Sequence, residues 1–124
     1  MNVVLWVIAG LLAAAFLVAG LVKVSQPREK LDEMGMGAVA VLSPGLVKTI
    51  GALEIAAAVG LILPAVTGIA PVFVPLAALG LVAMMIGAAI VHARRGEYSS
   101  IGANAFLLIL AAVVVWGRFG PYAF

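Results

Sequence analysis

The chain has 124 residues, of which 66% are hydrophobic and 10% are charged, and its formal net charge is +2. A soluble domain averages about 45–50% apolar and about 25% charged residues, so this composition is typical of a chain embedded in lipid. It excludes a nucleic-acid-binding surface, which needs clustered Lys and Arg. The absence of cysteine excludes disulfides and thiolate-held iron–sulfur clusters.

The first of four apolar runs covers residues 3–22 and contains no charge. A membrane-spanning helix needs roughly 20 apolar residues, and this run is long enough. We do not expect a cleaved signal peptide, because no Lys or Arg precedes the run and because it is longer than the apolar region of about 7–15 residues in such a peptide.

The connection at residues 23–45 is the longest in the chain. Residues 28–33 mix both charges, and apolar residues recur at helical spacing over 31–38, where two glycines interrupt them. Two interpretations stay open, namely a short helix lying in the membrane interface and a solvated loop.

The second and third runs cover residues 46–63 and 69–91. We expect the second to end at Pro64, because proline rarely continues a helix. Pro71 and Pro75 fall in the first turns of the third run, where a missing N–H costs least. These two spans are therefore predicted to be joined by a very short, uncharged turn.

The fourth run covers residues 101–116 and follows a polar break at 92–97. It is short for a span, so it either begins earlier or crosses the membrane with little tilt. The tail behind it holds Arg118, Tyr122 and Phe124, a basic and aromatic cluster that is typical of a membrane interface.

Together the four runs predict an all-α fold, an integral membrane four-helix bundle that forms one transmembrane domain. Arg118 is the one basic residue on the side that holds the two termini. The other side carries Lys23, Arg28, Lys30, Lys48, Arg94 and Arg95. The positive-inside rule therefore predicts cytoplasmic loops after the first and third spans and both termini outside. We expect a multi-pass protein of a bacterial-type plasma membrane.

Glu54 is the one acidic residue inside a predicted span. An ionisable group at membrane depth is costly and normally faces the bundle interior, where it has a partner. The other residues of its helix face recur at spacings of three and four, and they are Val47, Gly51, Ala58 and Leu61. Because small residues flank the carboxylate, a second helix can approach it closely.

Four further polar residues are predicted to lie in the same half of the bundle as Glu54: Lys23, Lys48, His92 and Asn104. One hypothesis is a polar pocket that binds a ligand head group, such as that of a quinone, or that relays protons. A second interpretation is a satisfied polar cluster that holds the helices together. A third is that the two lysines and the histidine snorkel to the interface.

No catalytic residue and no metal ligand is predicted. With one His and no Cys in the sequence, a conventional zinc site is not available. A nucleophilic triad is not assembled either, because the serines lie in predicted loops.

Several short motifs follow one another over nearly the whole chain. They are FLVAGLVK at 16–23, KTIGALE at 48–54, GLILP at 60–64, TGIAP at 67–71, PLAA at 75–78, HARRGE at 92–97 and WGRF at 116–119. This set resembles the DoxX-like family of small four-helix membrane proteins. The family name comes from a membrane thiosulfate:quinone oxidoreductase, so the resemblance implies the fold and an association with redox enzymes. It supplies no catalytic residue, although Glu54 and Lys23 match recurrent polar positions.

We therefore predict an accessory or structural subunit of a membrane oxidoreductase or respiratory assembly, without catalytic activity of its own and in contact with quinone. Its partners would be membrane lipid and either the proteins of that complex or further copies of itself, and not nucleic acid. The alternative is a stand-alone binder or carrier of a small lipophilic molecule that uses a polar pocket around Glu54.

Overall fold

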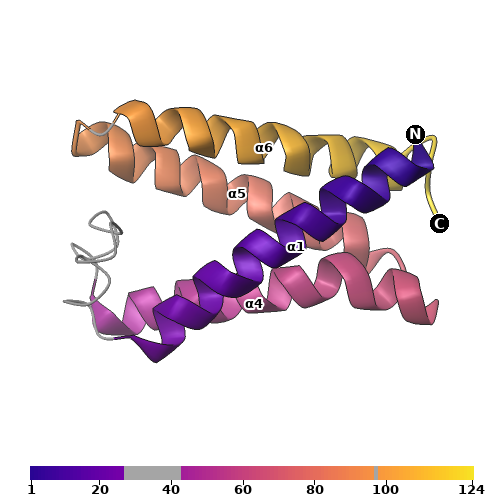
Figure 1. Ribbon diagram of the computed structural model, residues 1–124, viewed down its shortest axis with the longest axis horizontal. Helices are drawn as coiled ribbons and strands as arrows, with labels where there is room; N and C mark the ends of the chain where they lie inside the picture. The colour runs from indigo at the N-terminus through magenta and orange to yellow at the C-terminus, as the bar shows by residue number, and fades with distance from the viewer. Residues whose placement is uncertain (27–42, 97) are drawn as a thin grey trace.

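The computed structural model contains four long helices in the part of the chain that it describes (Figure 1). The described residues are 1–26, 43–96 and 98–124. The helices are α1 (Asn2–Ser25), α4 (Pro44–Thr67), α5 (Phe73–Arg94) and α6 (Tyr98–Phe119). Each contains an apolar stretch long enough to cross a membrane, which confirms the predicted all-α membrane bundle. The interfacial helix considered for the long connection falls mainly on residues outside this description.

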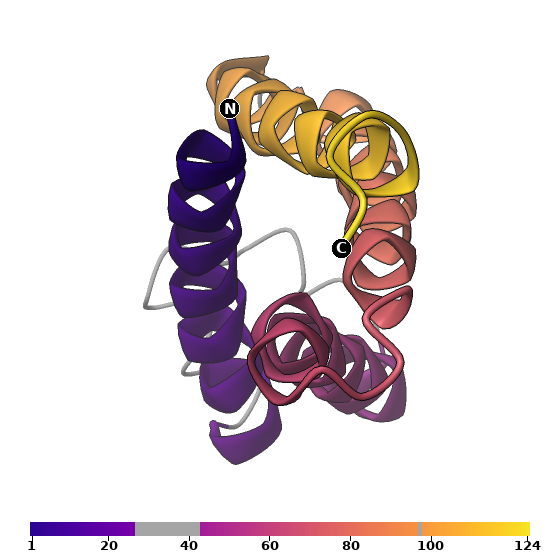
Figure 2. The same cartoon turned by 90° about the vertical axis from the view of Figure 1, so that its right-hand side faces the viewer.

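The four helices form a ring in which α1 packs on α4, α4 on α5, α5 on α6 and α6 on α1 (Figure 2). Helix α1 is diagonal, because its N-terminal end lies beside α6 and its C-terminal end lies beside α4 (Figures 1 and 2). We call the end that holds both chain termini the terminal end (Figure 1). The opposite end, at Ser25 and Arg94, is the loop end. There α1 and α4 lie together, and α5 and α6 lie together on the other side of the ring.

Apolar residues from all four helices meet in the core. The buried members are Leu12, Phe16, Ala57, Leu61, Val74, Ala78, Leu81, Met85, Ala111 and Val114. On each helix they recur at the spacing of one helical face. The outward faces also carry large apolar residues, such as the exposed Val3, Leu11 and Ile86, which suits contact with lipid chains.

Helix α4 is longer than predicted, and Pro64 lies inside it rather than at its end. Ser43 caps the start, because its Oγ accepts a hydrogen bond from the backbone N–H of Leu46 at 3.2 Å. Gly68 ends the helix with a φ of 72°, the left-handed conformation that glycine adopts easily. The prediction at Pro64 was wrong because lost backbone hydrogen bonds are costly in lipid. The helix gives up the bond that proline cannot make and continues to Thr67.

The boundaries of the other helices also differ from the predicted ones. Helix α5 begins at Phe73, so Pro71 precedes it and only Pro75 lies in its first turn. The turn before α5 is tight, because the N–H of Phe73 donates to the carbonyl of Ala70 at 3.0 Å. Helix α6 covers Tyr98–Phe119, so the fourth span begins earlier and ends later than the apolar run alone indicated.

Candidate functional site

The carboxylate of Glu54 lies buried between α1 and α4. Glu54 is 3% exposed, and the ammonium of Lys23 donates a hydrogen bond to its Oε1 at 2.5 Å. The other predicted members of this helix face are buried as well, namely Val47, Gly51, Ala58 and Leu61. Opposite charges in contact lower the cost of keeping either one inside the membrane. Of the four partners considered, Lys23 is the one that the structure brings onto the carboxylate.

The direction of helical side chains explains why Lys23 reaches Glu54. Side chains on an α-helix lean toward its N-terminus, so a lysine in the last turn of α1 leans back into the bundle. Lys48 behaves differently, because it is exposed and its Nζ donates to the backbone carbonyl of Val24 at 3.0 Å. A cation at the C-terminal end of α1 suits the helix dipole. Lys48 therefore binds the end of α1, which leaves Lys23 to neutralise Glu54.

Two glycines set the distance between α1 and α4 beside this ion pair. A Cβ atom on Gly20 would lie 2.6 Å from the carbonyl oxygen of Gly51, and one on Gly51 would lie 2.8 Å from the Cβ of Lys23. Only glycine permits this approach. Lys23 and Glu54 each follow one of these glycines by about one helical turn. The close crossing thus brings the two charged groups together.

His92 and Asn104 lie at the same loop end but on the other helix pair. Each is two turns from a buried core residue of its own helix, His92 from Met85 and Asn104 from Ala111. In the part of the chain that the structure describes, the Nδ2 atom of Asn104 is the one buried side-chain polar atom without a hydrogen-bond partner. Among the described residues, the α5–α6 side of the ring therefore holds a side-chain donor that the protein itself does not satisfy.

A second polar cluster closes the terminal end, and it was not predicted from the sequence as a buried site. Arg118 is 5% exposed, and its Nη1 donates to Asn2 Oδ1 at 2.6 Å and to the carbonyl of Tyr122 at 2.8 Å. Its guanidinium carbon lies 3.9 Å from the ring centroid of Phe124 and 5.9 Å from that of Trp6, within cation–π range. The sequence predicted a basic and aromatic tail cluster. One feature of the sequence could have indicated the contact with α1. Four antiparallel spans place the C-terminus on the same side of the membrane as the N-terminus.

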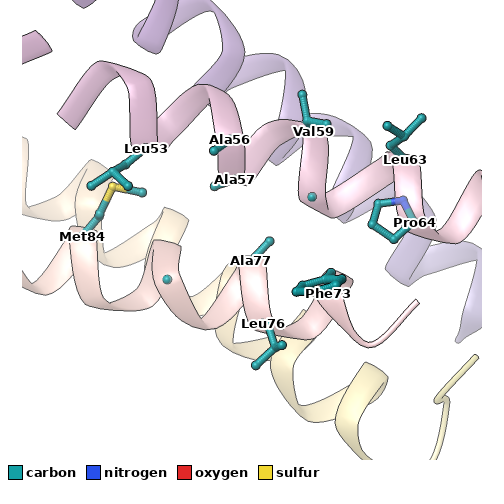
Figure 3. A pocket seen from close by; sticks show the side chains of 12 residues that line it. Leu53, Ala56, Ala57, Val59, Leu63, Pro64, Phe73, Leu76, Ala77 and Met84 are labelled. Carbon is teal, nitrogen blue, oxygen red and sulfur yellow. The ribbon is translucent and has the colours of Figure 1, made fainter. Parts of the chain in front are cut away.

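An apolar groove lies between α4 and α5 on the outer side of the ring (Figure 3). Its volume is about 520 Å³. The lining residues are Leu53, Ala56, Ala57, Val59, Gly60, Leu63, Pro64, Phe73, Leu76, Ala77, Gly80 and Met84. The two helices approach closely at Gly60, where a Cβ atom would lie 3.0 Å from the Cβ of Ala77. No polar side chain lines this groove.

Among the described residues, no group of three or more His, Cys, Asp or Glu side chains is placed to hold a metal ion. Glu54 is the one acidic side chain in that part of the chain, and Lys23 occupies one of its oxygens. The candidate features for a ligand site among the described residues are therefore the unpaired amide nitrogen of Asn104 and the walls of the apolar groove.

The sequence profile of the DoxX-like family matches residues 7–114. The chain belongs to the DoxX-like family. No curated protein and no solved structure matches it. The matched range of this DoxX-like protein includes the Lys23–Glu54 pair, Asn104 and the whole groove, and it ends before Arg118. The family thus accounts for a small multi-pass membrane protein, whereas the cluster at Arg118 lies outside the matched range.

Proposed function

We propose that this DoxX-like protein is an accessory subunit of a membrane oxidoreductase or respiratory assembly and has no catalytic activity of its own. The observation that carries the proposal is the contact between Lys23 and Glu54. It engages the one described carboxylate in holding α1 to α4. Removing one partner of a buried ion pair is strongly destabilising, so this contact supports a role of the carboxylate in helix packing.

The composition of the chain also supports this role. With no Cys and one His in the sequence, the chain lacks the protein ligands that usually hold iron–sulfur clusters or a pair of axial haem bonds. Electron transfer would therefore take place on partner subunits. The exposed apolar faces of all four helices give such partners a large surface inside the bilayer.

Purification from native membranes in a mild detergent tests the proposal. The affinity tag needs a long flexible linker, because both chain ends lie at the Arg118 cluster. We expect a flavin-, haem- or iron–sulfur-containing enzyme to co-purify in stoichiometric amount and to lose activity or assembly when this chain is deleted. Consistent recovery of the chain alone, with the deletion strain unimpaired, would contradict the accessory role.

The same preparation tests contact with quinone. Solvent extraction of the purified assembly should release quinone in a fixed ratio to this chain, detected by the ultraviolet absorbance change on reduction with borohydride. Quinone recovered only at the level of the surrounding lipid would show that the chain does not retain it.

A second candidate function is a stand-alone binder of a small lipophilic molecule at the loop end. The observation that favours it is the buried Nδ2 atom of Asn104, which has no acceptor in the described structure. A buried donor left without a partner costs free energy, and the oxygen of a ligand would remove that cost. Lys23, Glu54 and His92 lie at the same end of the bundle and would supply further polar contacts.

Replacement of the donor separates the two candidates. Asn104→Leu removes an unsatisfied polar group, so in the empty protein it should preserve or raise the thermal unfolding temperature. If the loop end binds ligands, the variant should also lose binding of a decyl-benzoquinone probe to the purified protein, and Glu54→Gln should weaken it. Unchanged probe binding in both variants would reject the stand-alone binder and leave the accessory subunit.

A further inference from the structure

We propose that the groove between α4 and α5 binds a lipid-soluble molecule that carries a hydroxyl group, and that the backbone carbonyl of Gly60 accepts the hydrogen bond from this hydroxyl. The inference goes beyond the accessory role and does not depend on it, because it concerns the isolated chain. It rests on the shape of the groove and on the position of Pro64.

The groove has the size of a small-molecule site and opens toward lipid. Its volume of about 520 Å³ falls within the range of roughly 300–1,000 Å³ of ligand pockets, which are lined mainly by apolar residues. Several of its lining residues, such as Leu53, Leu63 and Leu76, are exposed on the outer face of the bundle. An occupant therefore enters from the bilayer and brings an apolar body.

Pro64 creates a hydrogen-bond acceptor in this apolar wall. In a regular helix the N–H of residue 64 would donate to the carbonyl of Gly60, but proline has no N–H. Pro64 lies inside α4, so the Gly60 carbonyl loses its helical partner. Both residues line the groove, and Gly60 has no side chain to cover the oxygen. An unsatisfied carbonyl is costly in hydrocarbon, so a donor from the occupant is favoured.

The ends of the groove favour a compact molecule over a partner helix. Figure 3 shows Pro64 opposite Phe73 at one end and Leu53 beside Met84 at the other. A transmembrane helix would need a groove that stays open along many helical turns. These two side-chain pairs close the groove at both ends, so the groove is short. No lining side chain of the groove is polar, and the Gly60 carbonyl is an acceptor, so an occupant that donates, such as an alcohol or phenol, is favoured over a ketone or ether.

The test compares two probes that differ only in the donor. The purified full chain is placed in phosphatidylcholine nanodiscs with a photoreactive hexadecanol or with its methyl ether, and mass spectrometry maps the labelled residues. We expect saturable labelling of the groove lining at a concentration about three- to tenfold lower for the alcohol than for the ether, the usual effect of one hydrogen bond. Equal labelling by the two probes, or labelling spread evenly over all four helices, would overturn the proposal.

Three variants locate the contact. Pro64→Ala restores the missing N–H, so it should keep the fold and abolish the preference for the alcohol over the ether. Gly80→Leu should block both probes, since a Cβ at Gly80 meets nothing within 4 Å and the side chain can fill the groove. Gly87→Leu is the matched control, because its Cβ is equally unobstructed on the same helix but Gly87 does not line the groove. An alcohol preference that survives in Pro64→Ala, or labelling that survives in Gly80→Leu, would overturn the proposal.

Discussion

Gly20 and Gly51 meet backbone to backbone where α1 crosses α4, and a Cβ atom on Gly20 would lie 2.6 Å from the carbonyl oxygen of Gly51. The contact leaves no room for a side chain on either residue. It lies about one helical turn from the Lys23–Glu54 pair. The first two spans thus combine a steric and an electrostatic requirement at one crossing.

We predict that Gly20→Ala forces the two helices apart and lowers the free energy of unfolding by about 1–3 kcal/mol, the usual cost of overpacking. The matched control is Gly10→Ala on the same helix, where a Cβ meets nothing within 4 Å, so its effect should be small. Denaturation with sodium dodecyl sulfate, followed by circular dichroism, measures both. Equal stability of the two variants would show that the crossing is looser than the structure indicates.

The ion pair should show strong coupling in a double-mutant cycle. Lys23→Met and Glu54→Leu each leave a charged group without its partner, and breaking a buried pair typically costs about 3–5 kcal/mol. Replacing both groups with apolar residues, as in Lys23→Met/Glu54→Leu, should recover most of the loss. Additive losses in that double variant would mean that the two side chains do not act as a pair.

Lys48→Met serves as the control for this cycle. Lys48 is exposed and contacts only the carbonyl of Val24 among the contacts described, so its removal should cost about 0.3–1 kcal/mol, the size of a helix-dipole contact. A loss of stability as large as that of Lys23→Met would contradict this assignment, because Lys48 would then contribute as much as the lysine that contacts Glu54.

Arg118 is predicted to hold the C-terminal tail on the first turns of α1. Arg118→Lys keeps the charge but loses the planar group that lies over Phe124 and bonds Asn2, so it should lower stability by about 2 kcal/mol. In a Trp116→Phe background the fluorescence of Trp6 reports the change, because Trp6 contacts Phe124 with ring centroids 5.8 Å apart. An unchanged Trp6 spectrum in Arg118→Lys would contradict the role of the guanidinium.

The orientation can be tested directly, because the chain has no cysteine and each introduced one is unique. The positive-inside rule predicts that Ile69→Cys, in the α4–α5 turn, reacts with a membrane-impermeant maleimide added to intact cells. Ala93→Cys, at the loop end, should react only after the cells are opened. Both positions are exposed, so a reversed pattern would show that the protein has the opposite orientation.

Much of the fold follows from local properties of the sequence. The lengths of the apolar runs predicted four spans, and the spacing of small residues around Glu54 predicted the buried face of its helix. Both patterns depend on residues within a few turns of each other. The continuation of α4 through Pro64 was missed, since it depends on the cost of unpaired backbone groups in lipid rather than on the residue type. The contact of Arg118 with Asn2 depends on the diagonal course of α1, which no local pattern encodes.

The candidate site was predicted only in part for the same reason. Depth alone placed Lys23, Lys48, His92 and Asn104 with Glu54, and all five do lie toward the loop end. Which of them touch depends on how the helices pair. The structure joins α1 to α4 and α5 to α6 at that end, so Lys23 meets the carboxylate while Asn104 stands on the other pair.

The Lys23–Glu54 contact also bears on how the protein is made. Helix α1 precedes α4 in the chain, so Lys23 reaches the membrane before Glu54 does. A charged residue inside a span resists insertion, by up to roughly 2.5–3.5 kcal/mol at the helix centre on scales measured at the translocon. Because α1 is already in the membrane, α4 inserts beside the counter-ion Lys23. The order of synthesis therefore lowers the cost of inserting the Glu54 carboxylate.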